Sequence, residues 1–132
     1  MNYFLDTNIC IYHLNDSSPK ISGILEKTPL ERIKIPSMVA SELLYGAEKS
    51  VKREYNLEVS KKFLSLFEIV PFCEKAVEYY AFIRAELERR GKIISGNDLI
   101  TAATVMANKG ILVTHNIDEF SRIKNLAVED WV

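Results

Sequence analysis

YFLDTNICIY, residues 3–12, decides how the fold begins, because its apolar opening stops abruptly at an acid. Residues 3–5 are aromatic or aliphatic, as in a strand inside a protein core. Asp6 follows at once, and Thr7 and Asn8 come directly after it. A core strand has no use for a carboxylate, so Asp6 is either a turn residue at the end of the strand or the first part of a functional site.

Short apolar runs of the same kind recur along the chain. They are rich in aromatic or β-branched residues, which is typical of strands buried on both faces, and they comprise residues 33–35, 69–72 and 111–114. A last short strand is expected within LAVED, residues 126–130. Together with residues 3–5, these runs predict the strands of one sheet.

Segments with helical spacing lie between the predicted strands. Ser37 is expected to cap a helix that covers residues 38–49. Residues 74–90 keep apolar positions at helical spacing and stop at Gly91, a typical helix end. Residues 99–110 are nearly apolar all round and also end at a glycine, which predicts a helix in the middle of the protein.

Strands that alternate with helices predict right-handed crossovers and therefore a mainly parallel sheet. We expect an α/β fold, a three-layer sandwich in which helices flank the central sheet. At 132 residues the chain is about one domain long, so residues 1–132 are expected to form a single domain. Only NDSSP, residues 15–19, is an obvious loop.

Charge limits the class of ligand. The chain is 48% hydrophobic and 27% charged, as in ordinary globular proteins, and a net charge of −1 excludes a generic binder of polyanions. Contacts with nucleic acid would have to be local. Residues 49–55 and 84–92 each mix several cations with fewer acids, and the alternative is that both segments are solvated helix faces.

The apolar residues and the cysteines indicate the cellular compartment of the protein. No apolar stretch approaches the roughly 20 residues needed to span a bilayer, so a cytoplasmic protein is expected. Cys10 and Cys73 have no CxxC spacing and no nearby pair of histidines. Both are expected to be reduced thiols in the core.

Several acids are expected at one edge of the sheet. Ligands of open parallel sheets bind beyond the carboxyl ends of the strands, and Asp6 lies at such an end. Glu42 lies among small and apolar residues of one predicted helix, and Asp98 lies at the start of the most apolar one. Residues 113–120, VTHNIDEF, follow the fourth predicted strand and contribute further acids, among them Glu119.

Each acid also has an ordinary structural interpretation. Glu42 could simply point to water, and Asp98 could be a first-turn acid favoured by the helix dipole. Ser95 or Asn97 could cap the helix instead, which would free Asp98 for a site. The coincidence of four acidic positions at one edge favours a site.

A carboxylate cluster predicts a cation. Carboxylates held close together repel one another unless a cation binds them, and oxygen ligands select hard ions such as Mg²⁺ or Mn²⁺. Such an ion activates water and neutralises charge on phosphate oxygens. The predicted chemistry is therefore metal-assisted hydrolysis of a phosphodiester.

Four segments together resemble the PIN-domain ribonucleases, and specifically the VapC toxins of bacterial toxin–antitoxin pairs. The segments are FLDTNICIYHL at 4–14, MVASELLYGAEKS at 38–50, ISGNDLITAATVMANKGILVTHNIDEFSRI at 94–123 and LAVEDW at 126–131. The resemblance covers essentially the whole chain in the same order. It implies a metal-dependent endoribonuclease that acts as a toxin on tRNA or another structured RNA and leaves 5′-phosphate and 3′-hydroxyl ends.

The resemblance also implies roles for particular residues. Asp6, Glu42 and Asp98 match the three acidic positions of the family, and Asp6 and Asp98 are the implied direct ligands of Mg²⁺ or Mn²⁺. Glu119 aligns with the fourth acidic position, while Asn116 stands where some relatives have an acid. Which of these two is the fourth site residue stays open, as does the number of metal ions.

Further residues and partners are implied in the same way. Thr7 and Thr114 would orient ligands or water by hydrogen bonding. A cognate VapB-type antitoxin would lay its C-terminal segment in an apolar groove, and the toxin would form a homodimer. The cations chosen by location to hold the RNA backbone are Lys49, Arg53, Arg84, Arg89 and Lys92.

Other classes of protein fit the sequence less well. A haloacid-dehalogenase-type phosphatase needs an acid at the position of Asn8, and a phospho-receiver domain needs an acidic pair and a lysine that are not evident. A metal-free nuclease could use His13 and His115, although His13 has the setting of a packed or surface residue. A catalytically silent module that binds RNA or a partner would be expected to have lost one of the carboxylates.

Overall fold

The computed structural model describes residues 1–132, in which strands and helices alternate. The strands are β1 (Tyr3–Leu5), β2 (Ile33–Pro36), β3 (Glu68–Val70), β4 (Ile111–Val113) and β5 (Ala127–Glu129). The helices are α1 (Thr7–Leu14), α2 (Pro19–Lys27), α3 (Ser37–Glu48), α4 (Arg53–Leu64), α5 (Glu74–Arg89), α6 (Gly96–Ala107) and α7 (Ile117–Phe120), with a 3₁₀ turn, η1, at Leu30–Arg32.

The sheet is parallel throughout. Its strand order is β3-β2-β1-β4-β5, and all four neighbouring pairs run in the same direction. The central strand β1 pairs on both sides, since Tyr3 lies opposite Ile33 of β2 and Ile111 of β4. The predicted α/β fold with a mainly parallel sheet is confirmed.

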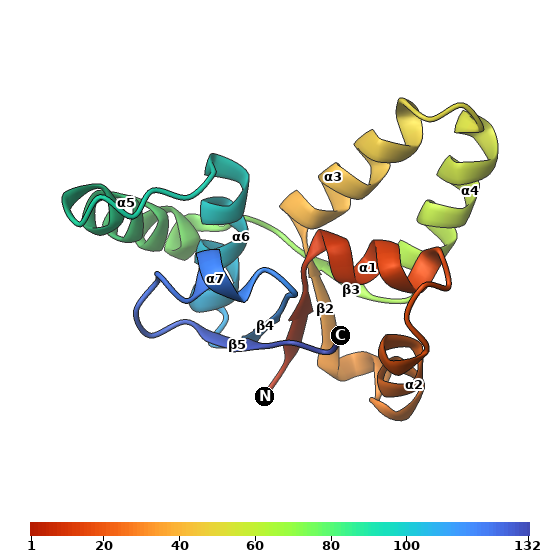
Figure 1. Cartoon of the computed structure of the whole chain (residues 1–132), viewed down its shortest axis with the longest axis horizontal. Coiled ribbons are helices and arrows are strands. Elements are labelled where there is room, and N and C mark those ends of the chain that lie inside the picture. The colour runs from red at the N-terminus through yellow and green to blue at the C-terminus, as the bar shows by residue number, and fades with distance from the viewer.

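Two apolar cores cover the two faces of this sheet. Leu5 and Val113 point into a core shared with α1 to α4, whereas Phe4 and Leu112 point into a core shared with α5, α6 and α7. Because successive strand residues face opposite sides, the neighbouring strands β1 and β4 each contribute to both cores. Figure 1 shows α1 to α4 on one side of the strands and α5 to α7 on the other, which confirms the three layers.

The order in which the chain adds strands to the sheet reverses between β1 and β4. The first three strands follow one another to one edge through α1 to α4, and the chain then returns through α5 and α6 to place β4 against the free side of β1. Crossovers on opposite faces leave a crevice between the carboxyl ends of the two strands where the order reverses. Asp6 follows β1 and Thr114 follows β4 at this crevice.

Several predictions about the elements were wrong in detail. Ser37 is the first helical residue of α3 and forms no side-chain cap, because Pro36 occupies the cap position. The third strand is shorter than predicted and lies at the edge of the sheet, so Ile69 is 44% exposed instead of buried on both faces. Cys10 is fully buried as expected, but Cys73 is only partly buried and precedes α5.

The helices α2, α4 and α7 were not identified from the sequence. Pro19 belongs to α2 and not to the predicted loop, since a proline is well tolerated in the first turn and Ser18 caps this helix through a hydrogen bond from the backbone of Ile21. The helix α4 begins at Arg53, within the cationic segment 49–55. None of the helices has both the length and the hydropathy needed to cross a bilayer.

Glycine is required at Gly91 and at Gly110 for different structural reasons. Gly91 follows α5 with a φ of 66°, the left-handed conformation predicted for a helix end. The helix α6 ends at Ala107, before Gly110, which begins the approach to β4. A Cβ atom on Gly110 would collide with Cε1 and Cδ1 of the Phe4 ring, and Phe4 is buried in the core.

Gly110→Ala is expected to destabilise the protein because the added methyl group must displace a fully packed ring. We expect the free energy of unfolding to fall by about 1–3 kcal/mol, measured by thermal and urea denaturation. Gly23→Ala is the matched control, since a Cβ atom at Gly23 within α2 meets nothing within 4 Å. The control should gain about 0.5–1 kcal/mol. An equal change in both variants would contradict the packing argument.

Candidate active site

The carboxylate of Asp6 is held at the centre of the crevice. The backbone N–H of Asp6 donates to the carbonyl of Val113 at 2.9 Å, so the residue continues the pairing of β1 with β4. One carboxylate oxygen accepts from the backbone N–H of Thr7 at 2.9 Å, and the other accepts from the Thr114 hydroxyl at 2.8 Å. The residue is only 7% exposed. Asp6 therefore caps α1 and also presents a buried acid.

Glu42 is connected to Asp6 through Thr7. The hydroxyl of Thr7 donates to Oε1 of Glu42 at 2.8 Å, while the backbone N–H of the same threonine binds Asp6. The second oxygen of Glu42 lies 3.5 Å from the side-chain amide of Asn97. The helices α3 and α6 thus meet at one carboxylate, and Glu42 does not simply point to water.

Sequence reasoning missed this role of Asn97, which it considered only as a helix cap. The cap of α6 is Ser95, whose hydroxyl oxygen accepts from the backbone N–H of Asp98 at 3.2 Å. Of the two possible caps, Ser95 is therefore confirmed. Asn97 directly precedes Asp98 in the sequence, and this position was the signal that could have drawn attention to Asn97.

Asp98 lies in the first turn of α6 and interacts with two other acids. The negative charge of Asp6 and a side-chain hydrogen bond with Glu119 both favour the protonated form of Asp98. Burial is the largest cause, and together these effects raise the pKa of Asp98 to about 6 even though the Ser95 hydroxyl opposes them. Asp98 therefore holds its proton more readily than an ordinary aspartate when no cation is nearby.

Burial also raises the pKa of Asp6. The hydrogen bonds from Thr114 and Thr7 favour the ionised form of Asp6 and limit this rise, whereas the charges of Glu42 and Glu119 add to it. The four predicted acids, from three helices and the end of one strand, thus act on one another electrostatically. The structure brings them to a single site.

The donor set suits a hydrated hard cation. No three acidic, histidine or cysteine side chains are arranged closely enough to enclose a metal ion by themselves. Mg²⁺ commonly binds through one or two carboxylates and keeps several of its waters. Asp6 and Asp98 provide two such carboxylates, and a cation between them would relieve the repulsion and burial that raise both pKa values.

Asn116 and Glu119 contact the site in different ways, Asn116 through its backbone and Glu119 through its side chain. Its backbone N–H donates to the Thr114 hydroxyl oxygen at 3.0 Å, and this hydroxyl in turn donates to Asp6. Asn116 supports the Asp6 carboxylate through its backbone, whereas Glu119 interacts with the acids through its side chain.

Both histidines have structural partners. Nδ1 of His13 lies 2.8 Å from the Ser22 hydroxyl, and the His13 ring packs against Phe63 with centroids 5.6 Å apart. The packed setting predicted for His13 is confirmed. Nδ1 of His115 lies 3.0 Å from Asp130, a pairing that sequence reasoning did not anticipate.

Three of the five cations selected for RNA have neighbours of their own. Arg84 bonds to Glu88 and Tyr80, Arg53 lies 2.6 Å from Glu48, and Lys49 lies over the Tyr45 ring. These contacts are typical of solvated helix faces. The other two cations are exposed and take part in none of the ion pairs; they are Arg89 and Lys92.

Comparisons with known proteins agree with this geometry. The family model described as "PIN domain" matches residues 3–126. Ribonuclease VapC2 from Rickettsia felis is 45% identical, over 99% of this chain and 98% of the relative, and the tRNA(fMet)-specific endonuclease VapC from Salmonella typhimurium is 36% identical over the same shares. A chain in the crystal structure of VapBC2 from Rickettsia felis bound to a DNA fragment from their promoter superposes with a TM-score of 0.92, at 44% identity and 100% coverage of both chains.

Asp98→Asn is expected to remove a pH dependence of stability in the presence of a chelator. An acid whose pKa rises from about 3.9 to about 6 on folding makes the free energy of unfolding decrease as pH rises between these values. The contribution of Asp98 to the stability of the wild type should therefore fall from about pH 4 to about pH 6. Asp98→Asn should lack this loss and melt a few degrees higher than the wild type at pH 7. Thermal melts across this pH range would measure both effects.

Asp118→Asn is the matched control, because Asp118 is an exposed acid in the first turn of α7. It should keep the wild-type pH dependence. If Asp98→Asn instead melts lower than the wild type in chelator, the dominant role of Asp98 is that of a first-turn helix acid.

Proposed function

The chain belongs to the PIN-domain family and, within it, to the VapC ribonucleases, and on this premise we propose that it is a Mg²⁺- or Mn²⁺-dependent endoribonuclease that acts as the toxin of a toxin–antitoxin pair. The observation that carries the proposal is the carboxylate of Asp6, which is held in the crevice by Thr7 and Thr114 and is only 7% exposed. Burial of Asp98 and, after it, the charge of Asp6 raise the pKa of Asp98. Such an arrangement is costly without a cation and suited to one with it.

Asp6 and Asp98 are the residues we propose as ligands of the ion. Each comes from a rigid element, since Asp6 is fixed by Thr7 and Thr114 and Asp98 is fixed at the capped start of α6. When bound, the ion would activate water and neutralise charge on the phosphate. Thr7 and Thr114 keep both oxygens of Asp6 oriented for this purpose.

Glu42 and Glu119 complete the proposed site around the two ligands. Glu42 is held from two sides, by Thr7 and Asn97, and its carboxylate would accept a hydrogen bond from the attacking water. The oxygen of that water forms a bond to phosphorus and one of its protons passes to Glu42 and then to solvent, while the bond from phosphorus to the 3′ oxygen breaks. The 3′ oxygen takes a proton from solvent, so the products are a 5′-phosphate and a 3′-hydroxyl. Of the two candidates for the fourth position, we favour Glu119 because its side chain interacts with Asp98.

The RNA substrate is proposed from the relatives. One relative is named a tRNA(fMet)-specific endonuclease, and we propose tRNA or another structured RNA as the target, met in the cytoplasm. Arg89 and Lys92, at the end of α5 and in the loop that leads to Asp98, are exposed cations that could contact phosphates.

A groove beside Glu42 is the proposed site of the antitoxin. The groove, of about 350 Å³, lies between α1, α3 and α4, and its apolar lining includes Leu14, Leu43 and Val59. Glu42 lies at its margin, so a basic residue of the bound segment would find a carboxylate there. We propose that a VapB-type antitoxin fills this groove, in keeping with the VapBC2 complex among the similar structures. We also propose that the toxin forms a homodimer.

Asp6→Asn and Asp98→Asn are each expected to abolish RNA cleavage while the protein stays folded, because the amide keeps the volume of the side chain and removes the charge that holds the ion. We expect cleavage to fall by at least about 100-fold, equivalent to about 2.7 kcal/mol or more of lost transition-state stabilisation. Gel assays on total tRNA with Mg²⁺, Mn²⁺ or chelator would measure it. Asp118→Asn should cleave like the wild type, and undiminished cleavage by the chelator-treated wild type would refute the metal dependence.

Removing the two free cations is expected to weaken RNA binding without moving the cut. Arg89→Ala combined with Lys92→Ala should lower the affinity and flatten its salt dependence, because contacts with phosphate release counterions but carry little sequence information. Lys61→Ala combined with Lys62→Ala removes the same charge from exposed positions on α4 and serves as the control. Equal salt dependence of binding in both double variants would show that Arg89 and Lys92 belong to a solvated surface that does not contact RNA.

A further inference from the structure

A second cavity lies at the end of the sheet opposite the acids. Since all strands are parallel, the residues before β1, before β4 and at the start of β5 share one edge, while Asp6 and its neighbours share the other. Met1, Gly110 and Ala127 from that amino edge line a cavity of about 570 Å³. This volume lies within the range of about 300–1,000 Å³ that is typical of small-molecule sites.

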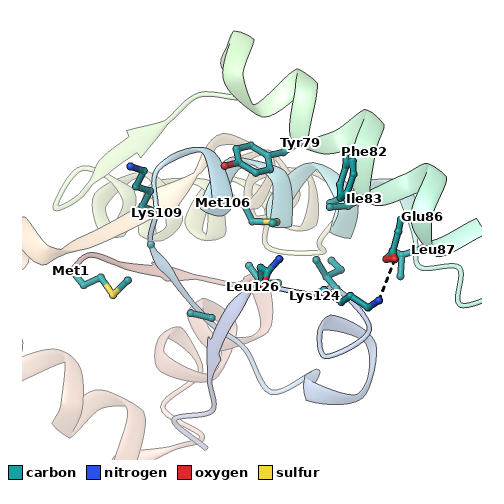
Figure 2. Close-up of a pocket in the computed structure, with 14 residues that line it drawn as sticks. Met1, Tyr79, Phe82, Ile83, Glu86, Leu87, Met106, Lys109, Lys124 and Leu126 are labelled. Carbon is teal, nitrogen blue, oxygen red and sulfur yellow. Dashed lines mark ion pairs between the residues drawn. The ribbon is translucent and has the colours of Figure 1, made fainter. Parts of the chain in front are cut away.

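The walls of this cavity are mainly apolar, with 9 hydrophobic residues among the 14 that line it. Figure 2 shows Tyr79, Phe82 and Ile83 of α5 along one side, Met106 of α6 beside them and Leu126 across from them. Phe82 is 66% exposed, so much of the surface of its ring is left in water. An apolar ligand would cover that surface.

The charged side chains around the cavity leave one positive charge unpaired. Glu86 is the only acid in the lining, and Arg90 at 2.9 Å and Lys124 at 3.8 Å already neutralise it. Lys109 at the other end of the cavity takes part in none of the ion pairs. Figure 2 shows the pair of Glu86 and Lys124 at one end and Lys109 toward the other. The free charge at the cavity is therefore positive.

We propose that this cavity binds a small amphipathic anion, with an aromatic or aliphatic body between α5 and Leu126 and an acidic group at Lys109. The apolar walls supply the burial, and the unpaired ammonium supplies the charge that complements a carboxylate or sulfonate. The proposal does not depend on the nuclease activity, because the cavity and the acids lie at opposite edges of the sheet.

The test uses the full chain and two matched ligands. 8-Anilinonaphthalene-1-sulfonate is the fluorescent probe, and decanoate and decanol compete for it with the same apolar chain but different charge. We expect decanoate to displace the probe at a concentration about tenfold lower than decanol does, as one charge-assisted contact would allow. Equal potency of the two ligands on the wild type would refute the acidic group.

Variants then locate the site. Lys109→Gln should weaken decanoate about tenfold and change decanol less than about twofold, and glutamine suits this test because it is no more strained than lysine at a φ of 52°. Phe82→Ala, at an exposed position that should not affect folding, is expected to weaken both ligands. Lys61→Gln, an exposed lysine on α4, should change neither.

Two alternatives predict different results: binding of the probe in the groove beside Glu42, and a second copy of the chain over the cavity. Tyr55→Ala alters the groove between α3 and α4 and should leave the probe signal unchanged. If Tyr55→Ala abolishes the signal, the probe binds that groove and the proposal fails. If Phe82→Ala instead lowers the sedimentation coefficient and leaves decanoate binding intact, a second copy of the chain covers the cavity and the proposal also fails.

Discussion

The pairing of β1 with neighbours on both sides is the constraint on which the rest of the structure depends. Because β1 is parallel to β2 and to β4, its last residue emerges between two other strand ends. Asp6 takes that place and still pairs with Val113 through its backbone. A side chain in this position is enclosed by the start of α1 and by the segment after β4, so only 7% of the residue is exposed.

A buried carboxylate needs partners, and each partner of Asp6 connects a different part of the chain to the site. Thr114 follows β4, and its hydroxyl joins Asp6 to the backbone of Asn116. Thr7 joins Asp6 to Glu42 on α3, which continues to Asn97 at the start of α6. Asp6 and Glu42 thus belong to one hydrogen-bonded network that reaches helices on both faces of the sheet. Their mutual repulsion is retained because the surrounding hydrogen bonds fix their positions.

The helix α6 connects the two functional ends of the molecule. Its first turn carries Asp98 at the carboxyl edge of the sheet, and Met106 near its last turn lines the apolar cavity at the amino edge. Between these ends its residues are buried in the core that also contains Phe4 and Leu112. A rigid helix that is buried along its length separates a polar site from an apolar one within a small fold.

Much of this arrangement was determined by the sequence alone, whereas contacts between distant segments were decided only by the tertiary structure. Local patterns fixed the alternation of strands and helices, the acid after the first strand and the helix end at Gly91, because apolar spacing and backbone conformation act over a few residues. The pairing of Asn97 with Glu42 joins residues 55 positions apart and has no local signature. The exposed edge position of Ile69 and the cavity beside Phe82 likewise depend on which neighbours the fold brings to them, since burial is a property of the assembled layers.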